Sequence, residues 1–241
     1  MEELQRKFIQ DFITDNRWHY IVDGLKVTLT VTVLSLIFGC IIGMVVGIIR
    51  CAHDQSRVVP GAKKTLSQII INILNAIAKL YITIIRGTPT MVQLLIMYFI
   101  ILVSMKSKVT VAVITFSINS GAYVAEIFRG GIMSVDNGQM EAGRSLGLSY
   151  VTTMIYIILP QAFKSVMPSL INELITLLKE TSICGYIGLN ELTRGGDIIR
   201  GTTYDAFLPL ICVAIIYLIM VLGIQAITNR VERRLRASDN R

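Results

Sequence analysis

The chain has 241 residues, of which 53% are hydrophobic and 16% are charged, and its formal net charge is +7 at pH 7. Because ordinary soluble domains have a smaller apolar share, this composition excludes a typical water-soluble protein and indicates a lipid bilayer as the solvent. The four cysteines and two histidines are scattered along the chain. We therefore interpret the cysteines as small apolar residues inside helices and expect no metal site.

The first 24 residues are polar and charged, which argues against a cleavable signal peptide. We expect residues 1–24 to form an extracytoplasmic helix at the membrane interface, because apolar side chains recur at helical spacing and two aromatic residues follow. These residues are Leu4, Phe8, Phe12 and Ile13, followed by Trp18 and Tyr20. Residues 25–241 would then form one membrane domain.

Five apolar segments approach the roughly 20 residues that a helix needs to cross about 30 Å of hydrocarbon. They cover residues 27–49, 87–105, 109–125, 166–178 and 206–229. In the first segment, Gly39, Gly43 and Gly47 share one helix face, which lets a second helix approach closely. That helix belongs either to this chain or to a second subunit. The sequence predicts an all-α integral membrane protein with about five transmembrane helices.

Residues 65–85 are apolar but interrupted by Asn72, Asn75 and Lys79, so we expect a helix that lies on or enters the membrane. The second span would follow the turn Arg86-Gly87-Thr88-Pro89, because proline suits the start of a helix. The short connection at residues 104–108 predicts a tight antiparallel hairpin between the second and third spans.

Lysines and arginines concentrate in the loop after the first span, in the region of residues 129–164 and in the C-terminal tail. Because basic residues stay on the cytoplasmic side, we expect the N-terminus outside and the C-terminus in the cytoplasm. The basic tail is interpreted as a topology anchor that contacts anionic lipid, and no nucleic-acid binding is expected.

The sequence contains none of the motifs GxxxxGK[ST], GxSxG or HExxH, so we expect neither an ATPase site nor catalytic residues in this chain. In the cytoplasmic loop, at about residues 130–162, residues 139–146 predict two helical turns that Gly147 ends as a left-handed cap. A helix this short requires a docking partner.

This loop resembles the EAA loop of ABC importer permeases, on the residues Glu141-Ala142-Gly143, Gly147 and Ile158-Leu159-Pro160. From about residue 22 to the C-terminus, the chain is similar to the polar amino-acid permeases of the histidine, glutamine and arginine type. The stretches that carry this similarity are residues 86–89, 92–94, 118–132, 178–182 and 232–235. Gly143 replaces the second alanine of the EAA pattern, which should weaken the helix by about 1 kcal/mol.

The resemblance implies a type I ABC importer permease in the bacterial cytoplasmic membrane, paired with a second permease copy or a homologous permease. It further implies ABC ATP-binding subunits, which carry ATP and magnesium, and an extracytoplasmic solute-binding protein that delivers a polar amino acid. This chain itself would hold no cofactor. Coupling to the ATPase is expected through Glu141, Ala142, Gly143, Arg144 and Gly147.

The candidate substrate contacts are Asn119, Tyr123 and Glu173, with Gln93 as a weaker one. An amino acid needs donors for its carboxylate and acceptors for its ammonium; Asn119 offers both, and Glu173 suits the ammonium or a cationic side chain. The alternatives are hydrogen bonds between helices for Asn119 and Tyr123, and a structural ion pair for Glu173. Glu126 and Arg129 are interpreted as a structural pair or gate.

Two other functional classes are compatible with a polytopic chain. A channel or ion-driven carrier would use the intramembrane carboxylates Glu126 and Glu173 and would need no ATPase. A membrane enzyme is disfavoured, because the sequence lacks a catalytic set of residues.

Overall fold

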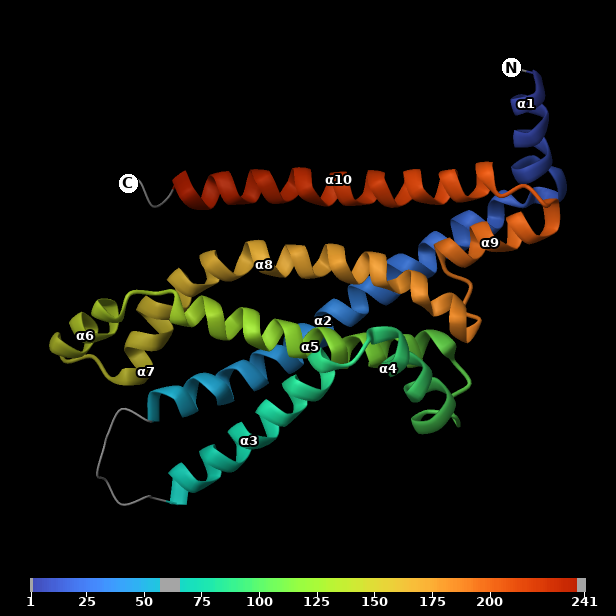
Figure 1. Ribbon diagram of the computed structural model, residues 1–241. Coiled ribbons are helices and arrows are strands. Elements are labelled where there is room, and N and C mark those ends of the chain that lie inside the picture. The colour runs from blue at the N-terminus through green and yellow to red at the C-terminus, as the bar shows by residue number, and fades with distance from the viewer. Residues whose placement is uncertain (1, 57–65, 238–241) are drawn as a thin grey trace. The chain divides into compact units, whose positions relative to one another are not determined.

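The computed structural model describes residues 2–56 and 66–237, and the regular structure of these residues is helical (Figure 1). The basic residues Arg57, Lys63 and Lys64 and the side chains of the predicted motif at 232–235 lie outside the described part. The elements are α1 (Glu2–Phe8), η1 (Ile9–Ile13), η2 (Thr14–Asn16), α2 (Trp18–Ser56), α3 (Leu66–Gly87), α4 (Thr90–Ile96), η3 (Met97–Ile101), α5 (Lys108–Met133), α6 (Asn137–Ser145), α7 (Tyr150–Thr153), η4 (Met154–Ile158), α8 (Leu159–Glu180), η5 (Thr181–Ile187), α9 (Leu192–Thr203) and α10 (Phe207–Ala237).

Five helices among the described residues are long and apolar enough to cross a membrane, which is the number predicted. They cover Trp18–Asp54, Leu66–Gly87, Lys108–Met133, Tyr150–Ile187 and Phe207–Arg230. The prediction of the second span was wrong, because the long helix is α3, while residues 87–105 form only the shorter apolar helix Thr90–Ile101. Asn72, Asn75 and Lys79 do not stop α3 from being a span, since all three lie on one side of the helix.

The chain forms two compact units, each with its own core. Unit 1 comprises Met1–Leu36, Pro89–Phe116 and Leu174–Val231, and unit 2 comprises Ile37–Thr88, Ser117–Glu173 and Glu232–Arg241. The long helices α2, α5 and α8 contribute residues to both units.

In unit 2, the glycine face of α2 packs against α5 of the same chain, which answers the question that the sequence left open. A Cβ atom built on Gly39 would lie 2.9 Å from the Ser120 Cβ, and one built on Gly43 would lie 2.4 Å from the Val124 Cγ1. Gly47 meets α5 in the same way one turn later, at Phe128. The absence of side chains on this face therefore permits the close packing of the two helices.

Two apolar clusters hold unit 1 together. The first joins α4 to the start of α5, since Leu94, Ala112 and Phe116 are fully buried in it. The two segments that were predicted to form a hairpin therefore pack together, although the first of them is a short helix. The second includes Phe12 and Leu192 and fixes the N-terminal segment to α9 and α10. Other apolar side chains of this N-terminal segment point outward, and Leu4, Phe8 and Ile13 are between 50 and 59% exposed.

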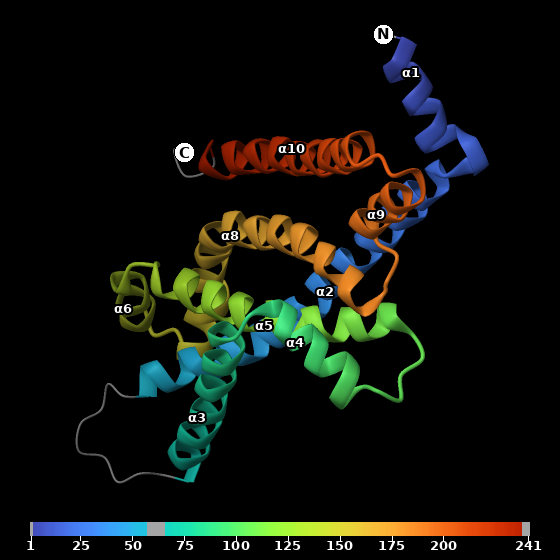
Figure 2. The ribbon, with the colours of Figure 1, turned by 45° about the vertical axis from the view of Figure 1, so that its right-hand side comes forward.

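Helix α9 lies along the first turns of α2 in unit 1, as Figures 1 and 2 both show. A Cβ atom on Gly195 would lie 2.4 Å from the Tyr20 carbonyl oxygen, and one on Gly24 would lie 2.7 Å from the Glu191 carbonyl oxygen. The backbone N–H of Leu192 donates a hydrogen bond to Thr28 Oγ1 at 3.2 Å. Small residues thus bring the two backbones together at the start of both helices.

Candidate functional site

Unit 2 contains a polar cleft of about 420 Å³ at the end of α3. Its wall comes from three helices, because α3 contributes its last turn, α5 the face around Tyr123, and α8 the face around Ser169. The lining residues are Arg86, Tyr123, Glu126, Ile127, Gly130, Gly131, Ser134, Ser165, Ser169 and Glu173.

Helical periodicity brings these side chains to one place. On α5, Tyr123, Glu126 and Ile127 occur at i, i+3 and i+4, and on α8, Ser165, Ser169 and Glu173 recur every fourth residue. Each set therefore lies on one face of its helix. A Cβ atom on Gly131 would lie 2.2 Å from the Val166 Cγ2, so α5 and α8 approach closely beside the cleft.

Glu126 is the centre of the charge network in this cleft. Its carboxylate lies 3.8 Å from the guanidinium of Arg50, 3.9 Å from that of Arg86 and 3.8 Å from that of Arg129. The predicted pair of Glu126 and Arg129 is therefore present, but Arg129 makes its shorter contact, at 2.9 Å, with Asp54 of α2. Glu126 thus links three helices, and none of the arginines in the described part of the chain comes closer to it than 3.8 Å.

Arg86 combines a charge with a flat, stacked surface. Its guanidinium carbon lies 5.2 Å from the centroid of the Tyr123 ring, which is a cation–π arrangement. Its side chain is 43% exposed, whereas that of Arg50 is only 13% exposed. Arg86 is therefore the more accessible of the two cations to a solute in the cleft.

The four candidate substrate contacts are not all in this cleft. Tyr123 and Glu173 line it, and the Glu173 side chain is largely buried. Asn119 lies one turn before Tyr123, is fully buried and does not line the cleft. Gln93 belongs to α4 in unit 1.

Sequence reasoning missed Arg86, Ser165 and Ser169 as cleft residues. It treated Arg86 only as part of the turn before the second span, and so did not count it with the polar residues of the preceding helix. The two serines and Glu173 carry a periodic signal, since their spacing of four residues places three polar groups on one face of α8.

The helix predicted at residues 139–146 is present as α6. Its first turn is capped by Asp136, whose carboxylate accepts a hydrogen bond from the backbone N–H of Gly138 at 2.7 Å. At its other end, the Leu148 N–H donates to the Gly143 carbonyl oxygen and the Gly147 N–H to the Arg144 carbonyl oxygen. Gly147 has a φ of +82°, so it is the left-handed cap that the sequence predicted.

Helix α6 has one side packed against α7 and one exposed side. Gly143 is buried, and a Cβ atom there would lie 2.5 Å from the Thr153 Cγ2 in α7. Glu141, Ala142 and Arg144 are exposed, and the Leu146 side chain is 81% exposed. Gly143 therefore does more than weaken the helix, because its lack of a side chain lets α6 pack against α7.

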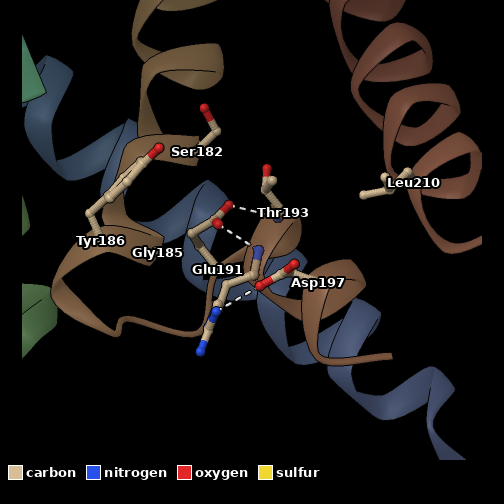
Figure 3. Close-up of a pocket in the computed structure, with 8 residues that line it drawn as sticks. Ser182, Gly185, Tyr186, Glu191, Thr193, Asp197 and Leu210 are labelled. Carbon is tan, nitrogen blue, oxygen red and sulfur yellow. Dashed lines mark hydrogen bonds and ion pairs between the residues drawn. The ribbon is translucent and has the colours of Figure 1, made fainter. Parts of the chain in front are cut away.

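Unit 1 has a separate polar cleft of about 340 Å³ between η5, α9 and the start of α10 (Figure 3). Its charged groups bind one another or the backbone: Glu191 accepts from the N–H groups of Thr193 and Arg194 at 2.8 and 2.7 Å, and Arg194 pairs with Asp197 at 2.7 Å. Burial raises the pKa of Glu191 against the effect of these hydrogen bonds. The guanidinium of Arg200, with that of Arg194, holds the pKa of Asp197 below its ordinary value. These groups cap the start of α9 and pair along it, and the Tyr217 hydroxyl of α10 donates to the Glu191 carboxylate at 3.3 Å.

Comparison with known proteins gives a consistent result. Residues 71–237 match the family described as "Binding-protein-dependent transport system inner membrane component". The chain is 39% identical over 219 residues to a putative glutamine transport system permease protein of Rickettsia felis, covering 90% of this chain and 93% of that one. It is 38% identical over 223 residues to the arginine transport system permease protein of Bacillus subtilis, covering 91% and 94%.

Solved structures agree with this result. An amino acid ABC transporter crystallised with histidines matches at a TM-score of 0.78 and 38% identity, over 92% of this chain and 98% of that chain. The methionine ABC transporter MetNI matches at a TM-score of 0.74 and 24% identity, which shows a shared fold. With its five candidate spans, the chain belongs to the family of inner membrane permease components of binding-protein-dependent transport systems.

Proposed function

We propose that this chain is the permease subunit of an ATP-driven importer and forms the path for a polar amino acid. Family membership supports the transport role, and relatives named for glutamine and arginine transport support the substrate class. The observation that carries the proposal is the cleft in unit 2, which holds the exposed Arg86 together with the carboxylate of Glu173.

The chemistry of this cleft suits an amino acid. A guanidinium binds a carboxylate through two parallel N–H donors, so Arg86 is the proposed partner of the substrate carboxylate. Glu173 is the proposed acceptor for the ammonium group, and the hydroxyl groups of Ser165 and Ser169 can donate to or accept from the substrate. The volume of about 420 Å³ falls within the roughly 300–1,000 Å³ of small-molecule sites.

We assign the energy source to separate cytoplasmic ATP-binding subunits, which would hold the ATP and magnesium. Helix α6 is the proposed docking element, since Glu141, Arg144 and Leu146 are exposed while Gly143 fixes the helix to the rest of unit 2. An extracytoplasmic solute-binding protein and a second permease complete the proposed transporter. A carrier driven by an ion gradient would not need a helix that docks an ATPase.

The test is co-purification of the ATP-binding subunit from native membranes in mild detergent. We expect it to accompany the native chain, and to be lost with Glu141→Ala and with Gly147→Asp, which removes the left-handed cap. Ser145→Ala, an exposed change on the same helix, is the matched control and should keep the subunit. If no ATPase accompanies the native chain, the importer proposal is wrong and an ion-driven carrier becomes the better explanation.

Uptake by the purified complex in proteoliposomes tests the substrate. We expect labelled glutamine, arginine or histidine to enter only when ATP and a solute-binding protein are both supplied. Uptake that follows an imposed ion gradient in the absence of ATP would contradict the proposal.

A further inference from the structure

Six polar residues of α3 form a single stripe along the helix. Gln68, Asn72, Asn75, Lys79, Thr83 and Arg86 follow one another at intervals of four, three, four, four and three residues. At 100° per residue, the six positions fall within an arc of about 80°. We call this set the α3 polar stripe.

The other two sides of α3 have different surroundings. Ala78 and Ile82 are buried, and Ile82 packs in a cluster with Ala122 and Ala125 of α5. On the far side, isoleucines and leucines are exposed by half or more; Ile73 is 55%, Ile77 60%, Leu80 61% and Ile84 52% exposed. Such a surface is suited to lipid. The helix therefore has a packed side, an apolar exposed side and a polar side.

The polar side does not fit a lipid environment. Asn72, Lys79 and Arg86 are exposed, although α3 is a candidate membrane span. Charged and amide side chains are costly in hydrocarbon and occur where a helix faces water or protein. Within a transport protein, a continuous polar face on a spanning helix indicates the path of the solute.

The stripe is continuous with the cleft in unit 2. Arg86 belongs to both, as the last residue of the stripe and as part of the cleft wall. Asn75 accepts a hydrogen bond from Arg50 at 3.5 Å, and Arg50 lies 3.8 Å from Glu126, which also lines the cleft. Polar groups thus run without a break from the middle of α3 to the proposed substrate site.

We propose that the α3 polar stripe lines the substrate path between the cleft and the N-terminal end of α3. This inference rests on the proposed function. Lys79 and Arg86 are seven residues apart, which corresponds to about 10 Å along the helix. They provide two successive positions for a carboxylate, with Thr83 between them and Asn75 and Asn72 beyond Lys79. The stripe therefore selects solutes that carry a carboxylate and repels free inorganic cations.

Thiol accessibility in the assembled transporter tests this path. The stripe variants Asn72→Cys, Lys79→Cys and Thr83→Cys are each paired with the next residue along the chain, as Ile73→Cys, Leu80→Cys and Ile84→Cys. The two residues of a pair lie at nearly the same position along the axis of α3. The second residue of each pair lies on the apolar exposed side and is the control. The native chain is the blank, since its four cysteines are buried or half-buried. The probe is a small anionic methanethiosulfonate, which does not partition into lipid.

We expect each stripe cysteine to react at least about tenfold faster than its control, and saturating substrate to slow the reaction at Thr83→Cys. Adding Lys79→Gln to the Asn72→Cys variant should lower the rate with the anionic probe several-fold relative to a cationic one. Equal rates within the pairs would overturn the proposal. So would disulfides that form between stripe cysteines of two copies while the probe has no access, because the stripe would then be a dry subunit interface.

The outcome of the thiol-accessibility experiment can be distinguished from the outcome of the uptake experiment that tests the proposed function. If the native complex takes up amino acids but the stripe cysteines do not react, the path inference fails and the importer remains. If the stripe cysteines react but no amino acid is taken up in the presence of ATP, the proposed substrate fails and the water-lined face of α3 remains.

Discussion

At the residue scale, Arg86 and Glu173 are the two side chains that give the cleft its proposed selectivity. Arg86 stacks on Tyr123 and remains exposed, while Glu126 lies 3.9 Å from it and attracts two further arginines. A substrate carboxylate that binds Arg86 would therefore compete with the Glu126 carboxylate, which is 3.9 Å away and is shared with two other arginines. Glu173 comes from α8 and places an acceptor in the same cleft.

Substitutions at these two positions should separate binding from assembly. Hydrogen bonds to charged groups contribute about 1.5–3 kcal/mol, so Arg86→Gln should raise the half-saturating substrate concentration for uptake about 10- to 100-fold. Glu173→Ala should abolish substrate-stimulated uptake. Both variants should keep their ATPase partner and the basal ATPase rate, measured on the purified complex. Unchanged uptake by Glu173→Ala would remove that residue from the site.

Asp11 makes the attachment of the N-terminal segment depend on pH. Its side chain is fully buried in η1 and neither carboxylate oxygen has a hydrogen-bond donor at good geometry. Burial raises the pKa of Asp11 above its ordinary value of 3.8, and Asp205 raises it further, against the opposing effects of Thr203, Arg17 and Lys7. Because the attached state has the higher pKa, attachment is strongest below about pH 4 and weakens as the pH rises through that raised pKa.

Amide hydrogen exchange over residues 9–16 measures this dependence. The variant Asp11→Asn keeps the shape and cannot ionise, so the ratio of native to variant exchange rates cancels the intrinsic pH dependence of exchange. We expect a ratio near one at pH 4 and a ratio of several-fold at pH 7. A ratio that stays constant across this range would show that Asp11 does not control the attachment.

At the element scale, the contact of α2 with α5 depends on glycines that have no space for a side chain. The built Cβ of Gly43 lies 2.4 Å from Val124, whereas Gly223 of α10 has no atom within 4 Å of its built Cβ. Overpacking a tight contact costs typically about 1–3 kcal/mol. Replacing a helical glycine that has free space around it by alanine stabilises the protein by up to about 1 kcal/mol. The same substitution should therefore have opposite effects at the two positions.

Thermal unfolding of the detergent-solubilised complex compares them directly. We expect Gly43→Ala to lower the midpoint temperature and Gly223→Ala to leave it unchanged or raise it. A midpoint for Gly43→Ala that equals that of Gly223→Ala would show that α5 yields to the added methyl group at no cost.

At the scale of the whole molecule, we predict the orientation in the membrane from the distribution of charge. The loop after the first span, residues 129–164 and the C-terminal tail together hold 12 Lys and Arg residues, against 7 in the regions that alternate with them, and five spans place the two ends on opposite sides. We expect a reporter enzyme that is active only outside the cytoplasm to work when fused before residue 18. A reporter that fluoresces only inside should work after residue 237. The reverse pattern would invert the assignment and place α6 outside.

The number of spans and the existence of α6 could be predicted from the sequence because both depend on local composition and capping. The second span could not, because a simple count of polar residues in α3 ignores that they share one face. Asn119 illustrates a different limit: its residue type suits a ligand, but burial is set by neighbouring helices that a single sequence does not place. Arg86 was missed for the same reason, since its role depends on Tyr123 and Glu126 of α5.

The packing of α6 against the rest of unit 2 has a mechanical consequence. Gly143 sits against Thr153 and Ile157, and Gln139 accepts a hydrogen bond from Gln161 at 3.4 Å. Gln161 lies in the first turn of α8, and the same helix carries Glu173 to the cleft. A closing ATPase that moves α6 would therefore also move the first turns of α8, and Pro168, which lies between Gln161 and Glu173, is the point at which this helix can bend. Movement of the ATP-binding subunit would then change the position of the Glu173 carboxylate in the cleft.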